Sequence, residues 1–187
     1  MKRIAAIMSD DSGVDAQALL AGAAGAARAL GMTVAGVLAE DLGFPDRICA
    51  AGTLRNIATG RGHTIYLPVA PPGTSCHLDP SGVEDACAEI LDELDGADLV
   101  ILSKFGKLEA GGTGLFRAFE AVIAFGKPIL TTVSGRHHGV FGEHVPEAHI
   151  RPANEAGIIR WLHSLLSPAQ LDTRRMTKRS KRTDSQS

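Results

Sequence analysis

Residues Leu99 to Gly114 read LVILSKFGKLEAGGTG. The first four are large and apolar, and a short uninterrupted apolar run is typical of a parallel strand that is covered on both faces. The residues that follow are rich in glycine and carry two lysines and a glutamate. This stretch therefore predicts a central strand of a parallel sheet whose carboxyl end runs into a charged loop.

Strands and helices alternate on both sides of this stretch. Short apolar runs predict the strands, and apolar residues that recur every three to four positions predict the helices. This alternation predicts a three-layer α/β sandwich with a mainly parallel sheet. The expected order is strand 3–8, helix 16–32, strand 33–40, helix 78–98, strand 98–103, helix 115–126, strand 127–133 and helix 155–166.

Residues 46–72 have a looser pattern. RICAAGTLRNI and HTIYLPV are the best strand candidates there, and we expect an antiparallel ribbon at the edge of the sheet. Within the helices, Gly22 and Gly25 lower helix propensity, so we expect them to allow a close approach of helix 16–32 to the sheet. Cys87 lies on the apolar stripe of helix 78–98 and is expected to be a core residue rather than a reactive thiol.

Length and charge predict one domain with a tail. The chain has 187 residues and a formal net charge of -2. Residues 168–187 contain six basic residues and two aspartates, which gives this tail a charge of +4 and leaves -6 on residues 1–167. We expect a single α/β domain over 1–167 and a solvated, disordered tail over 168–187, which is also a candidate contact for an acidic protein partner.

Composition also excludes several classes of function. An acidic body is unsuited to nucleic acid, because duplex binding depends on basic surface. No apolar run approaches the length that spans a membrane. The three cysteines, Cys49, Cys76 and Cys87, are odd in number and irregularly spaced, which predicts reduced thiols and a cytoplasmic location.

The loop between the first strand and its helix does not match a phosphate-binding loop. That motif needs two glycines, a lysine and a hydroxyl residue to cradle phosphates. Only Gly13 is available in SDDSGVDA, and Asp10, Asp11 and Asp15 would repel a polyphosphate without a cation between them. The simpler interpretation is a helix cap with acidic residues at the positive end of the helix dipole.

The loop at 103–114 is the better site candidate. Ligands in parallel α/β sheets bind beyond the carboxyl ends of the strands, where loops 9–15, 103–114 and 134–142 converge. Ser103 ends the predicted strand, Lys104 and Lys107 are cationic partners for an oxyanion, and Glu109 lies beside them. Arg117, one turn into the next helix, offers a bidentate contact. The same residues also suit a lysine–glutamate pair on a solvated turn, and spacing does not separate the two interpretations.

Two further clusters carry weaker signals. Residues 135–149 include His137, His138, His144 and His149 near two glutamates, but their spacing matches no strong metal signature, and we expect a solvated loop. Cys49 and Cys76 are candidates to meet in space, which spacing does not establish.

The motif SKFGKLE at 103–109, followed by glycines and an arginine-bearing helix, resembles the signature of a bacterial family, domain of unknown function 2478. Further matches are Asp15 with Leu19 and Leu20, Cys49, and CHLDP at 76–80, so that the resemblance covers roughly residues 3–165. The family usually has asparagine where this chain has Ser103. The family is similar to P-loop nucleoside triphosphatases, and its members tend to lie beside genes for molybdate uptake.

The resemblance implies a P-loop-like fold with a degenerate phosphate loop and a link to molybdenum metabolism. Our first hypothesis is a non-hydrolysing protein that binds a nucleotide or another small anion, such as molybdate, through Gly13, Asp15, Ser103, Lys104, Lys107, Glu109 and Arg117. The second is an atypical magnesium-dependent nucleoside triphosphatase that uses Asp10, Asp11 or Glu109 for the metal. The third is an adaptor for a transporter or a molybdoenzyme that acts through the tail.

Overall fold

The computed structural model describes residues 3–9, 15–41, 51–151 and 153–166. They form a seven-stranded sheet in the order β4-β3-β2-β5-β6-β1-β7, in which β2, β5, β6, β1 and β7 are parallel. The three-layer, mainly parallel α/β sandwich is therefore confirmed. The strands are β1 (Ile4–Ser9), β2 (Val34–Asp41), β3 (Ala51–Asn56), β4 (Gly62–Thr64), β5 (Leu99–Phe105), β6 (Ile129–Ser134) and β7 (His149–Arg151).

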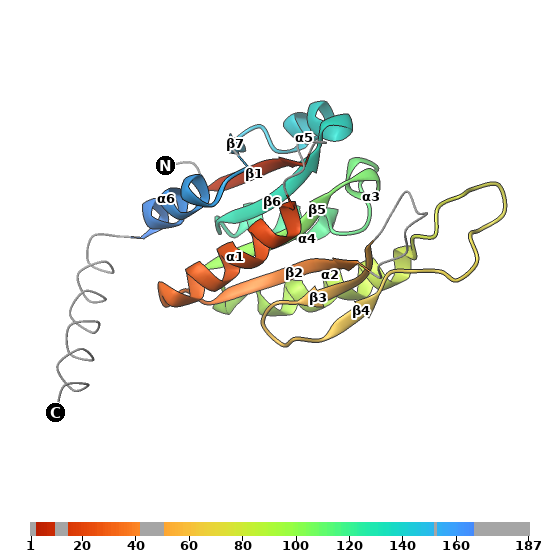
Figure 1. The fold of residues 1–187 in the computed structure, drawn as a ribbon, viewed down its shortest axis with the longest axis horizontal. Coiled ribbons are helices and arrows are strands. Elements are labelled where there is room, and N and C mark those ends of the chain that lie inside the picture. The colour runs from red at the N-terminus through yellow and green to blue at the C-terminus, as the bar shows by residue number, and fades with distance from the viewer. Residues whose placement is uncertain (1–2, 10–14, 42–50, 152, 167–187) are drawn as a thin grey trace.

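Helices cover both faces of the sheet, as Figure 1 shows for α1 on the near face. α1 and α6 pack on one face around Leu20 and Trp161, and α2, α4 and α5 pack on the other around Ile90 and Phe119. The helices are α1 (Ala16–Ala29), α2 (Pro80–Glu93), α3 (Lys107–Ala110), α4 (Phe116–Ala124), α5 (His138–His144) and α6 (Glu155–Leu165), with single turns η1 (Leu94–Gly96) and η2 (Gly135–His137).

The central strands have the burial that their sequence predicts. Five of the seven residues of β5 are buried in an unbroken run from Leu99 to Ser103, because β5 lies between β2 and β6 with helices on both faces. The strand ends two residues later than predicted, at Phe105, whose ring packs edge-on against Phe119 and Phe141. This aromatic contact fixes the point at which the 103–114 loop leaves the sheet.

The predicted antiparallel ribbon is confirmed. β3 pairs antiparallel with β2 and with β4, which places β4 at the sheet edge. A hydrogen bond of 2.5 Å between His63 Nε2 on β4 and Glu89 Oε2 on α2 links the ribbon to that helix. Burial raises the pKa of the Glu89 carboxyl, but hydrogen bonds from His63 and Thr59 outweigh it and hold that pKa below its usual value.

The expected role of Gly22 and Gly25 is wrong. Both glycines are exposed, and a Cβ atom added at either would meet no heavy atom within 4 Å. The face of α1 that contacts the sheet is made by Leu20 and by alanines, Ala23 and Ala27 among them. Alanine is already small enough for close packing, so the glycines fall on the solvent side.

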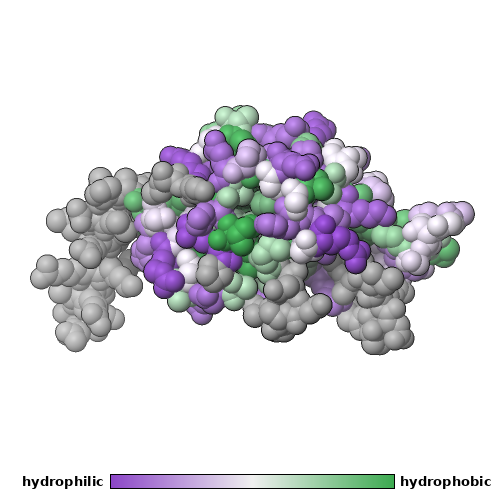
Figure 2. All heavy atoms as spheres, turned by 90° about the horizontal axis from the view of Figure 1, so that it is seen from above, coloured by the Kyte–Doolittle hydropathy of each residue, from purple (hydrophilic) through white to green (hydrophobic). Residues whose placement is uncertain are grey.

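One face of the molecule is seen from above in Figure 2. Figure 2 shows a predominantly hydrophilic face with small, separate hydrophobic areas. No helix among the described residues is both long enough and apolar enough to cross a membrane. The predicted tail, residues 168–187, and the predicted domain end at 167 lie outside the described residues, as do Asp10, Asp11, Gly13 and Cys49.

Candidate functional site

A cavity of about 380 Å³ lies at the carboxyl ends of β2 and β5. Its wall is completed by α1, the β3–β4 ribbon, the start of α2 and the loop after β5. The carboxyl ends of the strands are the edge of the sheet where ligands bind in α/β folds. We call it the carboxyl-end cavity. It is lined by Gln17, Ala39, Asp41, Leu54, Ile65, Leu78, Val83, Ser103, Lys104, Gly106, Lys107, Leu108, Glu109 and Leu115.

Two lysines supply the positive charge of this wall. Lys104 is the sixth residue of β5, and Lys107 is the first residue of α3, so the turn at Gly106 brings both to the same cavity. Both side chains are exposed, and within the described ranges no ion pair engages either ammonium group. Because both side chains are exposed, each ammonium group can contact an anion at this wall.

Ser103 links β5 to α1 beside the cavity. It is 2% exposed, and its Oγ donates a hydrogen bond of 2.8 Å to Gln17 Oε1. The same Gln17 oxygen accepts a hydrogen bond of 3.1 Å from the backbone N–H of Ala39. One side chain of α1 thus joins β5 to β2, and the peptide bond from Ser103 to Lys104 is cis. Gln17 is not among the residues predicted for the site, because nothing in a single glutamine on a helix indicates a partner 86 residues away.

Glu109 closes the loop rather than reaching a lysine. Its Oε2 accepts a hydrogen bond of 2.9 Å from the Gly106 N–H, and its Oε1 accepts one of 3.0 Å from the Leu115 N–H. The residue is 5% exposed. Both carboxylate oxygens therefore satisfy backbone groups that would otherwise be buried without a partner, and the loop from 106 to 115 is held in a fixed shape.

The environment of Glu109 also sets its charge. Burial raises the pKa of the Glu109 carboxyl, although the N–H groups of Leu115 and Gly106 and the charge of Lys104 lower it in part. A raised pKa reduces the negative charge that the cavity presents. Gly114 completes the loop, because it has φ of 63° and a Cβ there would lie 2.8 Å from Glu109 Oε1.

Asp15, which was predicted for the site from the first loop, does not line the carboxyl-end cavity. Asp15 is the N-cap of α1, and its Oδ1 accepts hydrogen bonds from the backbone N–H groups of Gln17 and Ala18 at 2.9 and 3.0 Å. This is the helix-cap geometry that the sequence favoured. Gly13 lies outside the described residues.

The structure does not bring Arg117 to the carboxyl-end cavity. Arg117 is exposed at the start of α4 and lines a separate cavity of about 230 Å³ together with Glu84 and Cys87. Cys87 is buried, as expected, and burial raises the pKa of its thiol. Of the predicted residues, Ser103, Lys104, Lys107 and Glu109 share one cavity, and Arg117 faces another.

The segment 135–149 is largely exposed, as expected, but the prediction that it is a loop is wrong. Apart from the Val145–Ala148 link, the segment is ordered as η2, α5 and the first residue of β7, because Phe141 and Val145 are buried in the core. His144 packs edge-on against Phe116 with ring centroids 4.8 Å apart. In the part of the chain that the structure describes, no group of three or more metal-ligating side chains is arranged to hold a metal.

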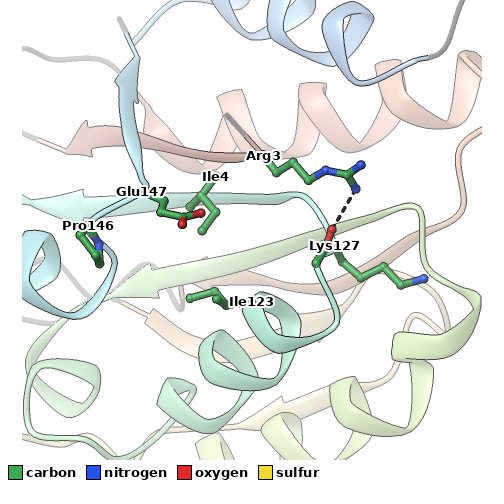
Figure 3. A pocket seen from close by; sticks show the side chains of 7 residues that line it. Arg3, Ile4, Ile123, Lys127, Pro146 and Glu147 are labelled. Carbon is green, nitrogen blue, oxygen red and sulfur yellow. Dashed lines mark hydrogen bonds between the residues drawn. The ribbon is translucent and has the colours of Figure 1, made fainter. Parts of the chain in front are cut away.

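A larger cavity, of about 480 Å³, lies at the opposite, amino end of the sheet (Figure 3). Its cations are Arg3 and Lys127, and both are engaged by backbone carbonyls. Arg3 Nη1 donates to the Gly126 oxygen at 2.9 Å, and Lys127 Nζ donates to the oxygen of Ala97 at 2.8 Å. Both cations therefore donate hydrogen bonds to carbonyl groups in the turns just before β6 and β5. The lysines of the carboxyl-end cavity are not engaged in this way, so that cavity is the better anion site despite its smaller volume.

Comparison with known proteins gives the family. The model of a family described as protein of unknown function (DUF2478) matches residues 4–161. The chain belongs to this family. It is also 35% identical over 79 residues to the molybdenum import ATP-binding protein ModC 2 of Bradyrhizobium diazoefficiens. That match covers 42% of this chain and 9% of the relative, so the chain spans less than a tenth of that protein's length. No solved structure matches the chain.

These findings agree with the architecture. The resemblance to domain of unknown function 2478 is confirmed over nearly the whole predicted range. Similarity to an ATP-binding protein fits a P-loop-like fold, and the parallel strands with helices on both faces agree with it.

Proposed function

We propose that the protein binds a small anionic ligand, a nucleotide or an oxyanion, in the carboxyl-end cavity and does not hydrolyse it. The observation that carries the proposal is the pair Lys104 and Lys107, two exposed ammonium groups on one cavity wall at the carboxyl end of a parallel strand. Lysine binds phosphate as a compact point charge, and two such groups on a preformed wall favour a single anion.

The position of Glu109 supports binding without hydrolysis. A magnesium-dependent triphosphatase needs carboxylates to hold the metal against the phosphates. Glu109 uses both oxygens on backbone N–H groups, and its pKa is raised by burial, so it is poorly suited to a metal. Magnesium-dependent phosphate release that disappears on Glu109→Gln would contradict this part of the proposal.

A link to molybdenum metabolism is the second part of the proposal. It is supported by the similarity to a molybdenum import ATP-binding protein, and molybdate is an oxyanion that the two lysines suit by charge.

The alternative function as an adaptor places the interaction on residues outside the described part of the chain. It predicts that removal of residues 172–187 abolishes capture of a protein partner while ligand binding is retained.

The experiment is a thermal-shift screen of the purified protein. The panel contains nucleotides with and without magnesium, molybdate, tungstate, sulfate and phosphate. A ligand at about 100 times its dissociation constant stabilises the native state by about 2.7 kcal/mol, which gives a clear rise in Tm. We expect a rise with at least one anion and no requirement for magnesium. No rise with any member would contradict the proposal.

Lys107→Ala is expected to weaken the binding of the anion by about tenfold or more, because a charge-assisted contact contributes roughly 1.5 to 3 kcal/mol. Isothermal titration of each variant measures the effect. Arg117→Ala and Arg160→Ala are the matched controls, since Arg117 lines the other cavity and Arg160 is exposed on α6. Equal losses in Lys107→Ala and in these controls would show a nonspecific charge effect and count against the site.

A further inference from the structure

The carboxyl-end cavity is divided into an apolar floor and a charged rim. Six large apolar side chains form the floor: Leu54, Ile65, Leu78, Val83, Leu108 and Leu115. Four of them, all except Leu78 and Leu108, are less than 5% exposed, so the floor reaches into the core between β3 and α2. The exposed lysines lie at the rim.

An inorganic oxyanion suits the charge of the rim but leaves the apolar floor unused. A small tetrahedral anion is strongly hydrated and meets only the lysines, and it leaves the apolar floor without a partner. Ligand pockets with a predominantly apolar lining and a few placed polar groups are typical of sites for organic molecules. The floor therefore points to a ligand with an apolar body.

The size of the cavity limits that body. About 380 Å³ is near the lower end of the range of roughly 300 to 1,000 Å³ in which small-molecule sites fall. A compact ring system with one anionic group fits this volume better than a dinucleotide does.

We propose that the cavity binds an organic phosphate monoester with one ring system, whose ring rests on the floor and whose phosphate meets Lys104 and Lys107. This inference rests on the proposed function and narrows its ligand class. It predicts that affinity has two separable contributions, one from the ring and one from the charge.

Ala39 offers a way to remove the first contribution alone. It is half-buried on β2, packs against the core cluster and lines the cavity, and its backbone N–H donates the hydrogen bond to Gln17. A larger side chain at this position fills space that the ring would occupy, and it keeps the backbone N–H that donates to Gln17. Ala39→Phe is therefore a blocking variant, and Ala39→Leu is a milder one that serves if Ala39→Phe does not fold.

The experiment is isothermal titration of the full chain with adenosine monophosphate, phenyl phosphate, adenosine and inorganic phosphate. We expect at least one of the two monoesters to bind tenfold or more tightly than inorganic phosphate. Ala39→Phe should abolish this preference, so that the monoester and inorganic phosphate bind this variant with about the same affinity. Lys107→Ala should weaken the monoester and inorganic phosphate alike. Val69→Phe, at a position 79% exposed and outside the cavity, is the control for an added phenyl group.

The outcomes separate the two proposals. If phosphate binds, no monoester binds more tightly, and Ala39→Phe has no effect, the apolar floor is not a ligand site and this inference is overturned, while anion binding stands. If none of the four compounds binds the wild-type protein, this inference is overturned, and the proposed function is overturned with it only if no anion of the thermal-shift panel raises Tm. A monoester preference that persists in Ala39→Phe and in Ala39→Leu would place the ring elsewhere and also overturn the inference.

Discussion

Glu109→Ala is expected to lower the free energy of unfolding by roughly 2 to 5 kcal/mol, because each buried donor left without an acceptor costs about 1 to 3 kcal/mol. The substitution removes both acceptors of the 106–115 loop, the oxygens that receive the N–H groups of Gly106 and Leu115. Chemical denaturation measures the loss. Glu120→Ala, at an exposed position of α4, is the control and should change stability little.

This effect of Glu109 should depend on pH. Burial raises the pKa of its carboxyl in the folded protein above the usual value of 4.5, so the folded state binds the proton more tightly than the unfolded state. The contribution of Glu109 to stability is therefore complete below about pH 4.5 and is lost as pH rises through the folded pKa. The difference between wild type and Glu109→Ala should shrink from pH 5 to pH 8. A difference that grows over this range would show that the pKa is lowered.

Gly82→Ala is expected to lower the free energy of unfolding by about 2 kcal/mol or more. Gly82 is buried in the first turn of α2, where a Cβ would lie 1.9 Å from the backbone oxygen of Thr64. Backbone is not free to move aside as a flexible side chain is, so α2 must shift away from β4. Since Ile65 and Val83 line the carboxyl-end cavity, the shift should also weaken ligand binding.

Gly25→Ala is the matched control, since it makes the same change in another helix. Gly25 is exposed on α1, and an added Cβ meets nothing within 4 Å. We expect a gain of about 0.5 to 1 kcal/mol, because alanine loses less backbone entropy in a helix. Thermal or chemical denaturation of both variants tests the pair, and effects of the same sign would contradict the packing described for α2 and β4.

The order of the fold was predictable because its signals are local. An unbroken apolar run gives a buried strand such as β5, and Asp79 before Pro80 gives the start of α2. Gly22 and Gly25 were misplaced because propensity does not tell which side of a helix faces the sheet. The segment 135–149 is rich in histidine and glutamate, which predicts a loop. The burial of Phe141 and Val145, which fixes the segment against the core, is not apparent from that composition.

Half of the site was predictable for the same reason. Lys104 lies near the end of β5, and Lys107 and Glu109 follow it, so their position at its carboxyl end follows from the strand alone. The positions of Gln17 and Arg117 depend on tertiary packing. Gln17 on α1 contacts both β5 and β2, and Arg117 at the start of α4 lies beside α2. The role of Glu109 was also not predictable, because its partners are backbone groups that carry no sequence signal.

The central claim is that the carboxyl-end cavity is the anion site. The most direct test is a two-dimensional ¹H–¹⁵N NMR titration of the labelled protein with the anion that gives the largest thermal shift. We predict that the perturbed amides cluster at Lys104–Leu115 with Gln17 and Asp41. Perturbations centred instead on Arg3, Gly126 and Lys127, or on Arg117 and Glu84, would contradict the claim and place the site in one of the other cavities.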